Sequence, residues 1–157
     1  MGLAFDRLAE ALQIRTVDES DEHARWEVYR TAVSDEAMLD LLHEALREEP
    51  ESALVSAVIV SVLERIDRTR RIKWVDILSD EHKVFASRRS AELGILEDFR
   101  SESISMTTVR DSIHGWSDWL QLKIAESVRI PDVLDCLSRE GRTKRIRRIA
   151  NESLRAV

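Results

Sequence analysis

The chain has 157 residues, of which 43% are hydrophobic and 34% charged, and its formal net charge is −6 at pH 7. This composition is typical of a soluble, folded protein of about one domain, and it excludes a disordered chain. The sequence contains only four glycines and two prolines, whereas sheet-rich folds and glycine-rich phosphate loops need many such turn residues. It therefore predicts an all-α fold of helices joined by short connections.

Three helix starts are marked by the same tripeptide, Ser-Asp-Glu, at residues 20–22, 34–36 and 79–81. A serine can cap free backbone N–H groups, and the two acids complement the positive end of a helix. Before the first of these starts, apolar residues at helical spacing predict a helix over residues 2–14. Its buried face carries Leu3, Phe5, Leu8, Ala11 and Leu12.

The helix that begins at the first tripeptide is expected to bury Trp26, Tyr29 and Val33. The helix from the second tripeptide ends near residue 48, because the residue before Pro50 is pushed away from helical angles. Pro50 then suits the first turn of a helix over about residues 50–66. This helix contains the longest apolar stretch, which is far shorter than the roughly 20 residues that span a bilayer.

A short helix is predicted over residues 71–78 and a longer one over residues 80–100. The apolar face of the longer helix carries Val84, Phe85, Leu93, Leu96 and Phe99. Residues 101–108 are rich in Ser and Thr, which have poor helix propensity, and they are the best candidate for a hinge. A short helix over residues 109–114 follows and is ended by Gly115.

Three more helices complete the chain. Ser117 caps a helix that runs to about residue 129, and Pro131 starts another that ends at Gly141. Thr143 starts the last helix, which is expected to bury Ile146, Ile149, Ala150 and Leu154. The sequence thus predicts about ten helices in a single domain, residues 1–157, with no convincing strand.

One apolar pattern with a central aspartate occurs three times, at residues 39–42, 75–78 and 134–137. Each copy lies in a short apolar-faced segment that is followed by a second helical pattern. Internal similarity of this kind is typical of stacked helix pairs. The pairs are expected at about residues 34–66, 71–100, 108–129 and 131–156.

The last pair carries a family resemblance. Residues 131–137, Pro-Asp-Val-Leu-Asp-Cys-Leu, form an apolar first helix. After the turn at Gly141, the second helix begins with basic residues and has a small residue, Ala150, in its middle. This arrangement resembles a HEAT-type repeat, and residues 39–66 and 75–99 are similar, whereas the first 33 residues do not fit. The resemblance implies an irregular α-solenoid with a scaffold or adaptor role, and it implies no catalytic residue.

The sequence contains few candidates for chemistry. Cys136 is the single cysteine, so no internal disulfide and no cysteine-rich zinc site can form, and its apolar neighbours favour a buried, inert thiol. No nucleophile elbow or phosphate loop is present. Glu36, Asp40 and His43 share one helix face and could be part of a metal site, although a solvated helix face explains them as well. We therefore predict no catalytic residue, metal or cofactor.

The charge distribution provides the main functional signal. Residues 139–157 contain seven basic and two acidic residues, so the C-terminal end is positive and the rest strongly negative. Further basic clusters occur at residues 68–73 and at residues 88–89. Either these side chains attract an acidic partner, or they pair with the abundant acids of neighbouring repeats. The residues we expect to bind are Arg142, Lys144, Arg145 and Arg148, with Trp116 as an exposed anchor beside Gly115.

The function predicted from these features is binding: a cytoplasmic, non-catalytic adaptor or inhibitor that presents a curved helical face to another protein, with no membrane segment. One alternative is nucleic-acid binding through the same C-terminal arginines. Another is an enzyme that uses an unrecognised carboxylate–histidine site at Glu36, Asp40 and His43.

Overall fold

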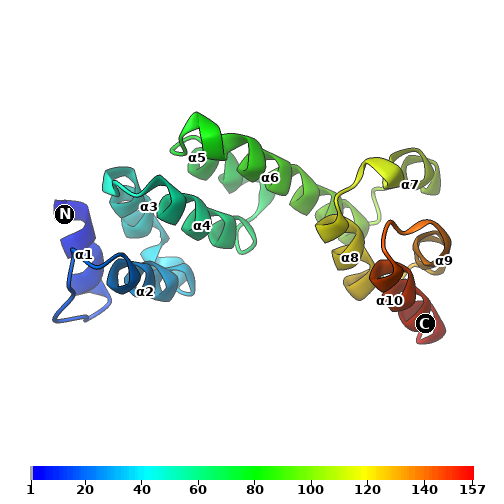
Figure 1. Ribbon diagram of the computed structural model, residues 1–157, viewed down its shortest axis with the longest axis horizontal. Coiled ribbons are helices and arrows are strands. Elements are labelled where there is room, and N and C mark those ends of the chain that lie inside the picture. The colour runs from blue at the N-terminus through cyan, green and yellow to red at the C-terminus, as the bar shows by residue number, and fades with distance from the viewer. Residues whose placement is uncertain (1) are drawn as a thin grey trace. The chain divides into compact units, whose positions relative to one another are not determined.

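A computed structural model describes residues 2–157 of the chain (Figure 1). Over these residues the protein is all-helical and has no strand, as the composition predicted. The α-helices are α1 (Leu3–Ala11), α2 (Glu22–Val33), α3 (Leu39–Glu48), α4 (Ser52–Leu63), α5 (Arg71–Val75), α6 (Asp80–Arg100), α7 (Met106–Ser112), α8 (Asp118–Ser127), α9 (Pro131–Glu140) and α10 (Lys144–Arg155). Short 3₁₀ helices, η1 (Glu36–Met38), η2 (Arg68–Arg70) and η3 (Ile113–Gly115), join some of them.

The chain divides into two compact units, Met1–Ser90 and Ala91–Val157, which we call the N-terminal and C-terminal units. The division falls within α6, a continuous helix of 21 residues. The hinge predicted at residues 101–108 lies inside the C-terminal unit and remains a prediction. Its last three residues form the start of α7, whose first turn is capped by Ser105.

In the N-terminal unit, α1 and α2 each pack against the next helix but one along the chain. Helix α1 contacts α3, and α2 contacts α4 as well as α3. Phe5, Leu8 and Tyr29 are buried, so α1 and α2 belong to the core of this unit, and the expectation that the first 33 residues fall outside the repeat pattern stays a prediction.

The C-terminal unit shows the same arrangement. Helix α7 contacts α9, and α8 contacts α10, while α9 and α10 pack against each other along the last pair (Figure 1). Helices α7 and α8 thus both pack against the last two helices of the chain. The core of this unit is formed by fully buried apolar side chains, Ile113, Leu120, Ile124, Leu134 and Leu137.

Four apolar residues expected in the core are exposed instead: Leu3, Ala11, Val84 and Phe85. Leu3 is 73% exposed, Val84 76% and Phe85 52%. Helix α6 turns the side that carries Ala86 and Leu93 towards the interior. The apolar pattern of α6 is spread around much of its circumference, so the periodicity did not determine which side would be covered.

All three Ser-Asp-Glu sequences stand at helix starts, but in the first two copies the capping residue is the aspartate and not the predicted serine. In the first two copies Asp21 and Asp35 accept the capping hydrogen bonds, from the backbone N–H groups of His23 and Ala37. The serines Ser20 and Ser34 lie one residue too early to do so. In the third copy α6 begins at the aspartate, so Ser79 occupies the preceding position.

A buried ion pair connects α2 to the turn between α3 and α4. The Arg25 guanidinium donates to both oxygens of the Glu49 carboxylate, at 3.1 Å each, and the Tyr29 hydroxyl donates to Oε2 at 2.7 Å. The Glu49 side chain is fully buried and that of Arg25 only 7% exposed. Burial, with the adjacent carboxylate, raises the pKa of Tyr29 far above its ordinary value. Every charge in this cluster therefore has a partner.

Candidate functional site

Helix α10 carries the predicted binding residues, and its amphipathic sequence determines which way they face. Thr143 caps the helix by accepting from the backbone N–H of Ile146 at 3.1 Å. Ile146 and Ala150 are buried, and Ser153 donates to the backbone carbonyl of Ala125 in α8 at 2.7 Å. The apolar side is thereby held against α8 and α9. Lys144, Arg145 and Arg148 are left exposed to solvent.

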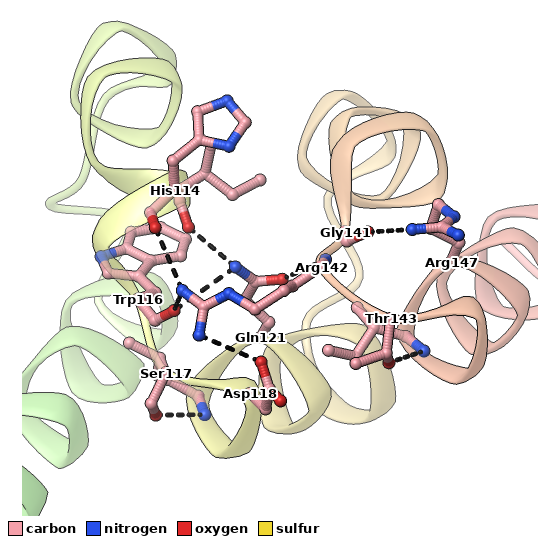
Figure 2. Close-up of polar contacts among 12 residues, drawn as sticks. His114, Trp116, Ser117, Asp118, Gln121, Gly141, Arg142, Thr143 and Arg147 are labelled. Carbon is pink, nitrogen blue, oxygen red and sulfur yellow. Dashed lines mark hydrogen bonds and ion pairs between the residues drawn. The ribbon is translucent and has the colours of Figure 1, made fainter.

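Arg142, which precedes the cap, is bound within the unit (Figure 2). Its guanidinium donates to the backbone carbonyls of Trp116, at 2.6 Å, and His114, at 3.1 Å, and to the Asp118 carboxylate, at 3.1 Å. These carbonyls lie at the end of η3, where backbone acceptors lack helical partners. Arg142 therefore joins the turn before α8 to the turn before α10.

Gln121 also connects these two turns, and the sequence analysis did not single it out. Its amide nitrogen donates to the carbonyl of Ile113 at 2.8 Å, and its carbonyl accepts from the backbone N–H of Arg142 at 2.9 Å. Gln121 is only 1% exposed. A polar residue next to Leu120 and close to Ile124 on α8 was the one available signal, because a buried amide needs partners.

The turn at Gly141 also depends on close contacts. A Cβ atom at this position would lie 2.6 Å from the carbonyl oxygen of Leu137 and 2.7 Å from a methyl carbon of Ile146. The carbonyl of Gly141 accepts from the Arg147 guanidinium at 2.5 Å (Figure 2). Position 141 therefore has room only for glycine. Arg147, in the first turns of α10, stabilises the turn through its hydrogen bond to the Gly141 carbonyl.

Trp116 is not the exposed anchor that we predicted. It is 7% exposed, and its ring lies edge-on to Phe99 with 6.1 Å between centroids. Its backbone carbonyl is held by Arg142 and Gln121. The expectation of exposure is wrong because the ring packs against Phe99 of α6 and is covered there. Trp116 is therefore a core residue of the C-terminal unit.

The remaining three predicted residues form the candidate surface, which we call the α10 basic face: Lys144, Arg145 and Arg148. Arg148 pairs with Glu152 one turn later, at 2.8 Å. Within the described residues 2–157, Lys144 and Arg145 have no ion-pair partner for their side chains. Both lie in the first turn, where the helix dipole is positive and acidic residues are favoured. Asp118 and Asp132 occupy that turn in α8 and α9.

Several residues of the other two basic clusters are bound inside the N-terminal unit. Arg71 is buried and donates to the carbonyls of Leu63, at 3.0 Å, and Ile66, at 2.9 Å, at the end of α4. Arg70 pairs with Glu36 at 2.6 Å, and Arg89 approaches Glu64 at 3.4 Å. For these residues, pairing with neighbouring helices explains the charge.

The carboxylate–histidine face of α3 is engaged in similar contacts. Glu36 binds Arg70, and Asp40 lies 3.7 Å from the Lys73 ammonium. The His43 Nε2 lies 3.1 Å from the carbonyl oxygen of Lys73, and its ring packs edge-on against Trp74 with centroids 5.0 Å apart. Among residues 2–157, no three His, Cys, Asp or Glu side chains are grouped so that they could hold a metal ion.

Cys136 is buried, at 8% exposed. Burial is the main cause that raises the pKa of its thiol. A raised pKa lowers the thiolate fraction, and the thiolate is the reactive form. The geometry of this residue is that of a packing residue of α9.

Comparisons of the chain with protein-family models, curated proteins and solved structures found no match. None of the helices within residues 2–157 has the length and apolar character needed to cross a membrane. Functional inference therefore depends on the α10 basic face and the helix packing.

Proposed function

We propose that the protein is a non-catalytic, cytoplasmic binding protein, an adaptor or inhibitor, that binds an acidic surface of another protein through the α10 basic face. The observation that carries this proposal is the pair of unpartnered cations, Lys144 and Arg145, in the first turn of α10. Cations at this end of a helix oppose its dipole, so the arrangement is unfavourable without a ligand. An approaching carboxylate would relieve the repulsion and interact with both charges.

We further propose that the helices form a HEAT-like α-solenoid. The support is the like-with-like packing within each unit, where first helices contact first helices and second helices contact second helices. Stacks of helix pairs expose extended surfaces that suit protein partners. The alternation of short and long helices, such as α5 and α6, would make this stack irregular.

An acidic protein fits the charges better than a nucleic acid does. The whole chain has a formal net charge of −6, whereas nucleic-acid-binding domains are usually basic. Several of the basic residues near the C-terminus are paired within the unit: Arg139 with Asp135, Arg142 with Asp118 and Arg148 with Glu152. A long phosphate backbone needs more free cations than this face supplies.

The proposal can be tested with two labelled probes of equal length, a poly-glutamate peptide and a single-stranded oligodeoxynucleotide. Fluorescence anisotropy at about 50 mM salt should show binding of the peptide, with affinity that falls as salt increases. The variant Lys144→Glu/Arg145→Glu should weaken peptide binding by about tenfold or more, because it reverses both free charges.

The matched control is Arg100→Glu/Arg110→Glu, which changes the net charge equally at exposed positions of the same unit. It should bind the peptide within about twofold of the unaltered protein. Equal losses in both variants would contradict a defined site. Tighter binding of the oligonucleotide, lost in the α10 variant, would instead establish the nucleic-acid alternative.

A further inference from the structure

The first half of α6 exposes a narrow stripe of side chains that belongs to no site described above. Glu81, Val84, Phe85 and Arg88 lie at helical positions i, i+3, i+4 and i+7, so they share one face. All four are exposed, and Val84 is the most exposed large apolar residue of the structure. The next residue along the same line, Glu92, is buried, so the stripe has a defined end.

The order of residues in this stripe is acid, apolar, apolar, base. Glu81 and Arg88 have no ion-pair partner among the described residues of the chain. Phe85 is oriented by the Arg89 guanidinium, whose central carbon lies 5.4 Å from the ring centroid. An exposed apolar centre with an unpaired charge of opposite sign at each end can be covered by a partner that carries the complementary pattern.

This pattern is self-complementary about a two-fold axis. When two copies of α6 run antiparallel and cross between residues 84 and 85, Val84 of each copy meets Phe85 of the other. The same crossing places Glu81 of each copy opposite Arg88 of the other. Parallel packing would instead oppose like charges. A symmetric, isologous contact of this kind is the commonest arrangement in homo-oligomers.

We propose that the protein self-associates through this stripe into an antiparallel, two-fold symmetric dimer. The apolar contact and two flanking ion pairs form a small interface, below the area of stable dimers. The dimer is therefore weak and dissociates on dilution. It is independent of the proposed function, because the stripe lies in the N-terminal unit and the α10 basic face in the C-terminal unit.

Sedimentation velocity of the full chain from about 5 µM to about 1 mM measures this equilibrium. The variant Val84→Glu should weaken dimerisation by at least tenfold, because it places a charge at the apolar centre. The control Leu3→Glu adds the same charge at an equally exposed apolar residue of the same unit, 73% exposed, and should leave the dissociation constant unchanged. A chain that stays monomeric throughout, or equal effects of both variants, would overturn the proposal.

Charge reversal tests the antiparallel register. Glu81→Arg alone and Arg88→Glu alone should each weaken the dimer, because each opposes two pairs of like charges. The double variant Glu81→Arg/Arg88→Glu should return the dissociation constant to within about threefold of the original, since the pairs are restored in reverse. Failure of the double variant to recover would also overturn the proposal. Circular dichroism confirms that each surface variant is folded.

Discussion

The buried carboxylate of Glu49 has a full set of hydrogen-bond partners. The Glu49 carboxylate accepts from Arg25 and Tyr29, and also from the backbone N–H of Glu51 at 3.1 Å. Arg25 in turn donates to the carbonyl of Glu19 at 2.8 Å. Such a cluster connects distant residues specifically, because any missing member leaves a buried charge or hydroxyl without a partner.

Glu49→Ala is therefore expected to lower the free energy of unfolding by about 3–5 kcal/mol, because Arg25 stays buried without its counter-charge. Glu27→Ala is the control: it removes a carboxylate that pairs with Arg30 at 2.8 Å on the surface, which should cost less than about 1 kcal/mol. Urea denaturation measures both values. Equal losses in the two variants would show that the buried pair adds nothing beyond a surface pair.

At the scale of elements, several helix starts each depend on one capping side chain. The sequence locates that capping residue only to within one position. Asp35 accepts from the backbone N–H of Ala37 at 3.0 Å and caps η1, which leads directly into α3. Ser34 lies beside it and is exposed. Ser and Asp are about equally good caps, so only the backbone geometry distinguishes them here.

Asp35→Ala should lower the free energy of unfolding by about 1 kcal/mol, because the cap is lost. Ser34→Ala should change it by less than about 0.5 kcal/mol, as for most exposed substitutions. Thermal or urea denaturation of the two variants is the measurement. The assignment of the cap would be contradicted if the serine variant proved the less stable.

At the scale of the whole molecule, two compact units share one long helix. Each unit has its own buried residues, such as Leu42 in the N-terminal unit and Leu134 in the C-terminal unit, both fully buried. Proteins open locally in contiguous cooperative units. A substitution that disrupts packing in one unit should therefore destabilise the helices of that unit first.

Leu134→Ala is expected to cost about 2–5 kcal/mol through the cavity that it leaves. Hydrogen exchange followed by mass spectrometry should show faster exchange in α7 to α10 and unchanged exchange in α1 to α4, because the C-terminal unit opens locally. Leu42→Ala should produce the reverse pattern. Uniformly faster exchange in both variants would mean that the chain unfolds as one cooperative unit.

Local patterns in the sequence were enough to predict the helical class, the number of helices and most of their boundaries. Capping residues, prolines and apolar periodicity act over a few residues, so they can be recognised without knowing the fold. The basic character of α10 and its inward Ile146 and Ala150 were predicted for the same reason.

The side of each helix that is covered could not be predicted in this way, because it depends on elements far away in the chain. Trp116 is a core residue because its ring packs against Phe99. Val84 is exposed because the opposite side of α6 is the buried one. Arg142 is bonded to Asp118, 24 residues earlier, whereas Lys144 and Arg145 are not paired. The sequence contains all of these cations, but only folding determines which of them remain free, since pairing requires two side chains to meet in space.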